Sequence, residues 1–467
     1  MTSRYDIAVV GAGDVGAAIA RSLSRFDLKT VLIDAGDVGA GTSKANTAIL
    51  HTGFDAKPGT LEAKLVARGH DLMLDYAEEV GIPIERTGAL LVAWTPEQVD
   101  RLPEIVENAR ACGYEKVAPV GVEELYRREP HLGPGALAAL EVPDEFIVCP
   151  WTPPLAYATQ AVLGGVELRR FEPVLAVERG EDSWLLRTSR GEIVASWLIN
   201  AAGLRSDEIH RMAGGEGFTV RPRRGELIVF DKLSRGLVDH ILLPVPTAKT
   251  KGVLIAPTVF GNVLLGPTAE DILDKRDTAS TRAGLEGLRE KGRTLMPELL
   301  DQEVTAVFAG LRAATEHADY QLGVDGERRY LWAAGIRSTG LSASLAIAEW
   351  ALERLLEAGL DPGPEGEIAA VRMPNIGEAG PRPFEDPAAI AADPEYGRVL
   401  CFCERVSAGE IRDALESPVP PRDADGLRRR TRALTGRCQG FFCAAKIQPM
   451  LGAGGLDPLA APTAEDR

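Results

Sequence analysis

The chain has 467 residues, 45% of them hydrophobic, which is enough for two or three domains with cores of their own. Its formal net charge of −16 argues against nucleic acid or an anionic membrane as a general partner. The best candidate for a transmembrane segment, residues 330–356, is interrupted by Arg337, Glu349 and Glu353, so none is expected. The first apolar run carries Asp6, which argues against a secretory signal and for a cytoplasmic protein.

The first thirty residues predict a βαβ unit. An apolar run at 5–10 indicates a buried strand, a helical pattern follows, and a second apolar run at 30–33 stops at Asp34. The glycines between strand and helix allow a tight turn, close approach to a pyrophosphate and close helix packing, and they are Gly11, Gly13 and Gly16. Asp34 stands where a carboxylate can bond an adenosine ribose. The unit predicts an ADP-containing dinucleotide without saying which one.

The next segment, residues 35–60, is rich in glycine and hydroxyl residues and can lie along a flat polar ligand. Thr42, Ser43 and Asn46 are the expected donors, and His51 follows them. His51 is read either as a catalytic group or as a histidine beside a turn with its hydrogen bonds satisfied, and spacing alone slightly favours the second. The pattern at 61–80 then predicts an amphipathic helix that ends at Gly81.

Later segments repeat the pattern of a strand followed by small residues. The run LINAAGL ends a strand at 201–203, which suits either a cofactor contact or a tight strand exit. A strand predicted at 304–312 ends with Gly310 and Arg312, and the turn at 335–341 precedes a helix at 342–359, whose N-terminus can face electron-rich ligand atoms. Because these segments lie far apart, they suit an extended FAD better than a nicotinamide cofactor.

The six cysteines are unevenly placed. Cys112 and Cys149 are expected to be small buried residues, whereas the other four lie within the last 67 residues as C-x-C, a 34-residue gap and C-x4-C. Without an export signal, a metal or cluster is favoured over disulfides. Residues 359–397, rich in proline and glycine, predict a linker before them.

The motifs GAGDVGAAIARSL, TSKANTAILHTGFDAKPGTLEAK, LINAAGLRSD, FAGLR and AAGIRSTGLSAS together resemble the FAD-dependent oxidoreductases of the D-amino-acid-oxidase-like superfamily, and most of all the glycerol-3-phosphate and L-2-hydroxyglutarate dehydrogenase branch. The resemblance covers roughly residues 5–356. It implies an α/β plus α+β fold with a discontinuous Rossmann-like FAD domain (1–85, 151–216 and 303–358) and an antiparallel-sheet substrate domain (86–150 and 217–302).

On this resemblance the FAD contacts are assigned to the glycine motif, the loop after it and the later strand ends. They are Gly11, Ala12, Gly13, Val15, Gly16, Asp34, Ala35, Thr42, Ser43, Asn46, Thr47, Val174, Ala202, Gly203, Gly310, Gly335, Thr339, Gly340, Leu341 and Ser342. Whether the FAD is covalently attached stays open.

The tail, residues 398–450, resembles a bacterioferritin-associated-ferredoxin-like domain. The resemblance implies a [2Fe-2S] cluster on Cys401, Cys403, Cys438 and Cys443. Zinc is the alternative, although zinc sites usually contain C-x2-C pairs. Residues 401–447 hold nine Lys and Arg against six Asp and Glu, which supports the cluster because cations offset thiolate charge.

The resemblance implies a flavin-dependent dehydrogenase that oxidises a small anionic alcohol such as glycerol 3-phosphate and passes electrons through the cluster to an acceptor. His51 is the expected base or a group fixing the flavin, Arg312 the anion clamp, and Arg337 a second cation. The family often has Arg-Pro where this chain has Arg312 and Ala313, so the substrate stays open.

Two other functions stay open. A 2-hydroxy-acid or amino-acid (opine) dehydrogenase would keep the same flavin, and a non-catalytic flavin and iron-sulfur subunit would only transfer electrons. The tail also implies an electron-acceptor partner, which could be a ferredoxin, a quinone-linked subunit or another copy of the chain, so homo- and hetero-oligomers both stay open.

Overall fold

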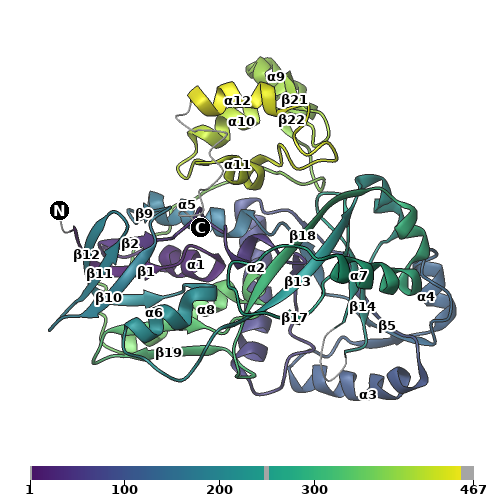
Figure 1. The fold of residues 1–467 in the computed structure, drawn as a ribbon, viewed down its shortest axis with the longest axis horizontal. Helices are drawn as coiled ribbons and strands as arrows, with labels where there is room; N and C mark the ends of the chain where they lie inside the picture. The colour runs from purple at the N-terminus through teal and green to yellow at the C-terminus, as the bar shows by residue number, and fades with distance from the viewer. Residues whose placement is uncertain (1–2, 247–251, 454–467) are drawn as a thin grey trace.

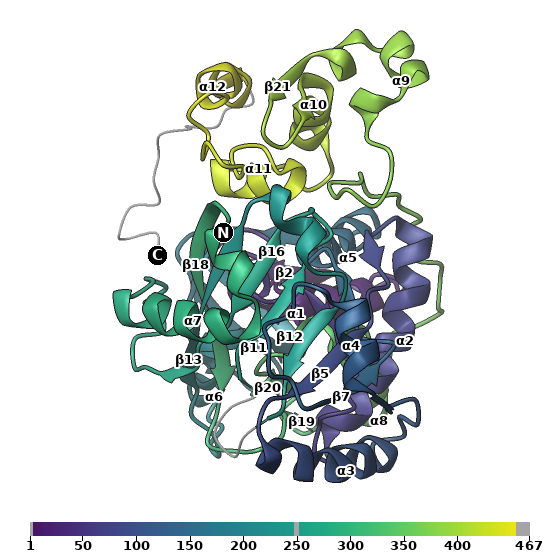
Figure 2. The ribbon, with the colours of Figure 1, turned by 90° about the vertical axis from the view of Figure 1, so that its right-hand side faces the viewer.

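The computed structural model describes residues 3–246 and 252–453, and these form two packed sheet domains with a small third unit on top of them (Figures 1 and 2). The first sheet has the order β10-β11-β12-β1-β2-β9, with β20 beside β12 and β19 beside β20. Its strands are β1 (Ser3–Val10), β2 (Thr30–Ile33), β9 (Glu167–Arg169), β10 (Val174–Arg179), β11 (Trp184–Thr188), β12 (Gly191–Asn200), β19 (Gln321–Asp325) and β20 (Tyr330–Ala334).

The centre of this sheet is parallel, and this decides where the ligand edge lies. Val10 at the end of β1 is in register with Ile33 of β2 and with Asn200 of β12. The three strands therefore end at one edge, which is where open parallel sheets bind ligands. One face is covered by α1 (Asp14–Leu23), which packs against α5 (Thr152–Leu163) and α8 (Gly340–Glu357). The helix α2 (Leu61–Val80) packs on α8. The helix α6 (Ser206–Met212) contacts β10 and β20.

The second sheet is mainly antiparallel and has the order β17-β13-β16-β15-β14-β5-β7-β6, with β18 also on β13. Its strands are β5 (Ala89–Ala93), β6 (Ala118–Val120), β7 (Ala138–Val142), β13 (Arg221–Phe230), β14 (Ile241–Pro244), β15 (Leu254–Pro257), β16 (Val263–Gly266), β17 (Glu270–Asp271) and β18 (Val304–Ala314). Its helices are α3 (Pro96–Ala111), α4 (Val122–Arg128) and α7 (Arg282–Leu295). The prediction placed 303–358 in the flavin domain, but β18 pairs with β13 along its length and so belongs to this sheet.

A three-stranded sheet lies between the two domains. It consists of β3 (Ile49–Leu50), β4 (Ile84–Glu85) and β8 (Phe146–Val148). Short 3-10 helices complete the two domains at η1 (Thr42–Lys44), η2 (Gly203–Arg205), η3 (Lys232–Leu237) and η4 (Pro297–Asp301). The predicted helix at 61–80 is confirmed: the Thr60 hydroxyl caps it by accepting from the Ala63 amide, and Gly81 ends it at φ +82.

The C-terminal unit has a small core of its own around Leu400, Val406, Ile411 and Leu427. Its elements are η5 (Pro383–Glu385), α9 (Pro387–Ala392), η6 (Pro394–Gly397), β21 (Val399–Cys401), β22 (Val406–Ser407), α10 (Ala408–Glu416), α11 (Ala424–Thr431) and α12 (Ala444–Ala453). The segment before it follows the surface of the flavin domain, since the amides of Gly366 and Met373 donate to the carbonyls of Arg25 and Val80.

A buried ionic cluster holds this unit against the flavin domain. Asp37, three residues after the ribose-binding position, is 1% exposed and pairs with Arg170 of its own domain at 2.7 Å and with Arg430 of α11 at 2.8 Å and Arg429 at 3.2 Å. These guanidinium groups outweigh the cost of burial and hold the pKa of Asp37 well below its usual range. Arg429 and Arg430 of α11 thus bind a carboxylate of the first domain.

A second contact joins the C-terminal unit to the substrate domain. The Arg432 guanidinium lies 4.0 Å from the ring centroid of Phe260, which stacks on Trp151, and Arg432 also pairs with Glu404 at 2.9 Å. Across the described residues the structure has no helix that is both long and apolar enough to cross a membrane.

Candidate active site

The turn between β1 and α1 brings backbone directly against a ligand cavity. Gly11 has φ +108, and a Cβ there would lie 2.3 Å from the carbonyl oxygen of Ala201. At Gly16 a Cβ would lie 1.8 Å from the carbonyl oxygen of Gly11. Only glycine fits either position. The N-terminus of α1 opens into a cavity of about 1100 Å³. The free amides and partial positive charge of this helix end suit a diphosphate.

Asp34 lies at the end of β2, beside this turn. Its Oδ2 accepts from the Ala12 amide at 2.6 Å and its Oδ1 from the Gly36 amide at 2.7 Å. Burial raises the pKa of Asp34. Asp34 and Ala35 both line the cavity, at the position that binds the ribose in dinucleotide folds.

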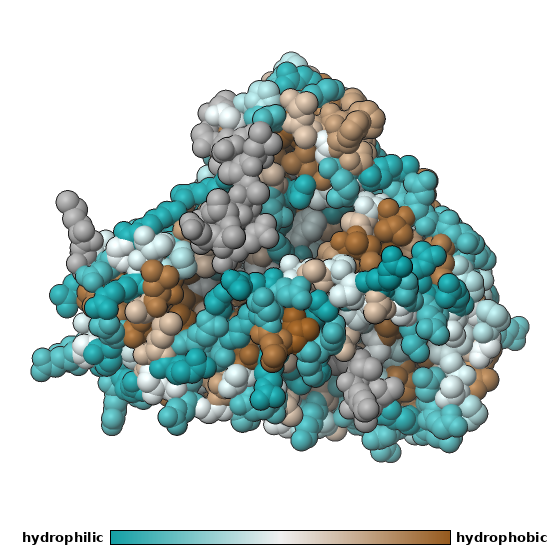
Figure 3. Space-filling model, in the orientation of Figure 1, coloured by the Kyte–Doolittle hydropathy of each residue, from teal (hydrophilic) through white to brown (hydrophobic). Residues whose placement is uncertain are grey.

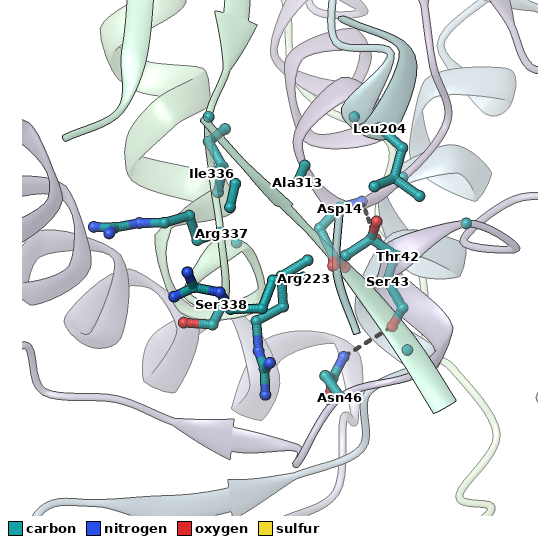
Figure 4. Close-up of a pocket in the computed structure, with 18 of the residues that line it drawn as sticks. Asp14, Thr42, Ser43, Asn46, Leu204, Arg223, Ala313, Ile336, Arg337 and Ser338 are labelled. Carbon is teal, nitrogen blue, oxygen red and sulfur yellow. Dashed lines mark hydrogen bonds between the residues drawn. The ribbon is translucent and has the colours of Figure 1, made fainter. Parts of the chain in front are cut away.

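The loop at 42–47 forms the next part of the wall (Figure 4). Ser43 Oγ accepts from the Asp14 amide at 3.0 Å, and Asn46 Nδ2 donates to the Ser43 carbonyl at 2.9 Å, so two of the three expected donors shape the loop itself. The Thr42 hydroxyl is buried and finds no hydrogen-bond partner among the described residues. Buried polar groups are normally paired, so a polar ligand atom fits here.

Asp14 is a cavity residue that the sequence analysis did not single out. It is 5% exposed, its Oδ1 has no hydrogen-bond partner in the described part of the chain, and it stands at the start of α1. Burial raises the pKa of Asp14 to about 7, against the lowering effect of Ser43. An acid inside the glycine motif, beside the place of a diphosphate, was the signal available in the sequence.

The remaining predicted contact segments meet at the same cavity. Its lining includes Val15, Thr47, Val174, Ala202, Gly203, Gly310, Gly335, Gly340 and Leu341. Gly310 of β18 faces the 42–47 loop so closely that a Cβ would lie 2.1 Å from the Ala45 carbonyl oxygen. The cavity thus runs along the strand ends of the first sheet and reaches β18 of the second, which fits the extended shape of FAD.

Four predicted contact residues lie outside the cavity lining and support it from behind. The Ala12 amide binds Asp34, and Gly16 packs under Gly11. Thr339 Oγ1 contacts the Tyr320 hydroxyl at 2.5 Å and donates to Glu62 at 3.1 Å. Ser342 Oγ accepts from the His51 amide at 2.8 Å, so the start of α8 positions His51.

His51 lines the cavity and is oriented by Glu145, a residue that sequence reasoning missed. His51 Nδ1 lies 2.8 Å from Glu145 Oε2, and Glu145 is fully buried. The other carboxylate oxygen, Oε1, accepts from the Thr52 amide at 2.6 Å and from the Thr52 hydroxyl at 2.9 Å. A carboxylate at Nδ1 selects the tautomer with the proton on Nδ1, so Nε2 is the basic atom.

Arg312 lies at the other side of the cavity and has no carboxylate partner among the described residues. Its Nη1 donates to the Thr268 carbonyl at 3.3 Å. Burial, with the neighbouring charge of Arg223, lowers the pKa of Arg312 to about 10. Gly225 leaves the space for its guanidinium, because a Cβ there would lie 2.8 Å from Nη2. A partly buried guanidinium with a cationic neighbour favours an anionic ligand.

Arg337, the expected second cation, is already paired within the chain. It lines the cavity, but its Nη2 donates to Glu62 at 2.8 Å and to the Ala318 carbonyl at 2.6 Å. Its side chain points away from Thr42, Ser43 and Asn46 in Figure 4. The cation beside Arg312 is instead Arg223, which Asp271 binds at 2.6 Å from the outer side.

The four cysteines of the C-terminal unit act on one another, with hydrogen bonds within the pairs Cys401–Cys443 and Cys403–Cys438. Burial raises the pKa of the Cys443 thiol to about 12, and the adjacent Cys401 adds to this. The Phe442 amide lowers the pKa of Cys438, and the Cys403 thiol contributes to that lowering. Within residues 3–246 and 252–453 no three His, Cys, Asp or Glu side chains are arranged to hold a single metal ion. Four thiols within one small unit suit a [2Fe-2S] cluster.

Comparisons with known proteins agree with this geometry. A family model described as FAD dependent oxidoreductase matches residues 6–354, and one described as BFD-like [2Fe-2S] binding domain matches residues 399–453. The chain is 33% identical over 452 residues, 96% of its own length and 94% of the relative's, to a glycerol 3-phosphate dehydrogenase of Caloramator mitchellensis. It is 31% identical over 282 residues to the mitochondrial L-2-hydroxyglutarate dehydrogenase of Caenorhabditis elegans. This match covers 57% of the present chain and 64% of the relative.

Among solved structures, the reduced L-alpha-glycerophosphate oxidase from Mycoplasma pneumoniae with FAD bound superposes with a TM-score of 0.75 at 27% identity, covering 80% of this chain and all of that one. The predicted fold class and both cofactors, FAD and the [2Fe-2S] cluster, are confirmed. The chain belongs to the FAD dependent oxidoreductase family, to which it adds a BFD-like [2Fe-2S] binding domain at its C-terminal end.

Proposed function

We propose that this enzyme oxidises the secondary alcohol of glycerol 3-phosphate to a ketone. The observation that carries the proposal is Arg312, a partly buried guanidinium without a carboxylate partner in the described structure, with Arg223 beside it. A phosphate dianion matches two adjacent guanidinium groups in charge and in bidentate geometry. The similarity to the Caloramator mitchellensis dehydrogenase over nearly the whole chain supports the same substrate.

The histidine and arginine groups divide the work on the substrate. Arg312 and Arg223 hold the phosphate and so orient the carbinol carbon in the cavity. His51 Nε2 accepts the hydroxyl proton, and Glu145 stabilises the imidazolium that results, since its Oε2 stays on Nδ1–H. FAD, held by the turn at Gly11, by Asp34 and by the 42–47 loop, supplies the hydride acceptor when bound.

The C-terminal unit gives the electrons a way out. Cys401, Cys403, Cys438 and Cys443 hold the cluster, and Gln439 Nε2 donates to the Thr305 carbonyl at 3.1 Å, on the strand that carries Gly310 and Arg312. This arrangement supports a dehydrogenase with an electron-carrier partner. All six cysteines are unpaired, which suits the reducing cytoplasm.

Anaerobic mixing of the holoenzyme with candidate substrates tests the proposal. We expect glycerol 3-phosphate to bleach the flavin absorbance, while L-2-hydroxyglutarate and glycine leave it unchanged. Arg312→Ala removes two charge-assisted hydrogen bonds, so kcat/KM for glycerol 3-phosphate should fall roughly 10²- to 10⁴-fold, with Arg289→Ala on α7 as the matched control. Bleaching by a 2-hydroxy acid or an amino acid instead would refute the substrate, and no bleaching by any of them would favour a non-catalytic subunit.

A further inference from the structure

Three phenylalanines of the C-terminal unit are exposed, and all three stand beside cluster cysteines. Phe402 lies between Cys401 and Cys403 and is 64% exposed. Phe441 and Phe442, between Cys438 and Cys443, are 82% and 67% exposed. Exposing three large aromatic side chains costs free energy in water, and such a patch indicates a contact surface. We call these three residues the aromatic rim.

The pairing of the cysteines brings both parts of the rim to one place. Cys401 interacts with Cys443 and Cys403 with Cys438, so the segments that carry Phe402 and Phe441–Phe442 approach each other. The rings of Phe441 and Phe442 meet edge to face, with centroids 5.2 Å apart, and Lys446 Nζ lies 5.0 Å from the ring centroid of Phe402. Figure 3 shows hydrophobic residues at the surface of this unit among hydrophilic ones.

The cysteine site is only partly shielded from solvent, and the rim residues flank it along the chain. Cys403 and Cys438 are partly exposed, whereas Cys401 and Cys443 are buried. On the inner side, Gln439 contacts Thr305 of β18 and Arg437 pairs with Asp231. The segment around Cys438 therefore contacts β18 and Asp231, while the three rim side chains are exposed to solvent.

The segment that carries Phe441 and Phe442 has a charge opposite to that of the whole chain. Residues 433–453 contain Arg437 and Lys446 and no Asp or Glu, although the chain has 68 acidic residues in 467. Lys446 is exposed, and the structure places it against Phe402. A surface with an apolar centre and a cationic edge complements an acidic partner.

We propose that the aromatic rim and Lys446 form the docking surface for a small acidic protein that carries single electrons. This inference rests on the proposed dehydrogenase function. Oxidising one alcohol to a ketone releases two electrons and two protons, so two oxidised carriers are each reduced by one electron per substrate, and the protons pass to solvent. Carrier and enzyme must separate between the two transfers, which suits a small surface of this kind.

The test measures binding separately from turnover, with an acidic b-type cytochrome domain as the probe and a basic c-type cytochrome as the charge control. Binding of each cytochrome to the oxidised holoenzyme is titrated at low and at high salt. The variants are Phe441→Ala/Phe442→Ala and Lys446→Glu. Leu163→Ala, which also removes an exposed apolar side chain, and Lys291→Glu, which makes the same charge change on α7, are the matched controls.

We expect saturable, salt-sensitive binding of the acidic cytochrome, a Kd at least tenfold higher for the double Phe variant, and weaker binding with less salt dependence for Lys446→Glu. The control variants and flavin bleaching by glycerol 3-phosphate should not change. No saturable binding at low salt, equal Kd values across the variants, or tighter binding of the basic cytochrome would overturn the proposal. So would dissociation of an oligomer by the Phe variants in sedimentation, because the rim would then join copies of the chain. Failure of the proposed function would appear separately, as absence of bleaching.

Discussion

Replacing Glu145 by glutamine should place the ring proton of His51 on Nε2, so that Nε2 can no longer act as a base, while the shape of the site hardly changes. Glu145 Oε1 accepts from the Thr52 amide, which can only donate, so the oxygen of the new amide must stay on that side. The NH₂ group then faces His51 Nδ1 at the 2.8 Å position of Oε2. Nδ1 has to become an acceptor, and the ring proton moves to Nε2. A base without a lone pair toward the substrate cannot take its proton.

The size of the effect follows from the role of a general base. Proton abstraction by a positioned base contributes about 10²- to 10⁴-fold, so the rate constant of flavin bleaching by glycerol 3-phosphate should fall by that factor, or about 3–5 kcal/mol in activation free energy. Stopped-flow absorbance under anaerobic conditions measures it directly. Glu349→Gln, which removes an exposed carboxylate that pairs with Arg68, is the matched control.

If Glu145→Gln binds FAD normally and bleaches within threefold of the wild-type rate, the pair of His51 and Glu145 does not supply the base. A rate that falls together with FAD content or thermal stability would instead indicate a structural role for Glu145.

Three further predictions concern other parts of the molecule. Above pH 7 Asp14 ionises next to the position of the diphosphate, so the Kd for FAD should rise about tenfold per pH unit. Asp14→Asn should remove this rise, which equilibrium titrations of FAD at several pH values measure. The same pH dependence in Asp14→Asn would contradict the prediction. Gly225→Ala places a Cβ 2.8 Å from Arg312 Nη2 and should raise KM roughly 10- to 100-fold while the flavin spectrum and melting temperature stay the same; an unchanged KM would count against the clamp. Asp37→Asn leaves buried arginines without their shared carboxylate, which should weaken docking of the C-terminal unit by about 3–5 kcal/mol. Limited proteolysis in residues 359–381 should therefore be faster, while substrate still bleaches the flavin. Equal rates of proteolysis would show that the ionic cluster does not hold the unit.

Much of the cofactor site could be predicted because its signals are local. At Gly11 and Gly16 any Cβ atom would lie within 2.5 Å of a backbone oxygen of the first βαβ unit or its neighbouring strand, so only glycine fits there. The cysteine spacing likewise indicates its chemistry from a short segment. The order of these motifs was enough to identify the family and both cofactors.

The assignment of donors in the 42–47 loop was less certain, because hydroxyl and amide groups can serve the protein or the ligand. Ser43 and Asn46 serve the loop, and Thr42 is the one whose hydroxyl has no partner in the described structure. Arg337 shows the same ambiguity, since its pairing with Glu62 depends on how α2 packs beside the turn before α8.

The sequence by itself determined the dinucleotide fold, the FAD cofactor and the [2Fe-2S] binding domain, because backbone sterics and thiolate chemistry act over a few residues. Only the tertiary structure decided that Glu145 orients His51 across 94 positions and that Arg429 meets Asp37 across 392. Such pairs form where strands and helices from different segments pack together, and any acidic or basic residue could have been the partner until the fold placed one of them within hydrogen-bond distance.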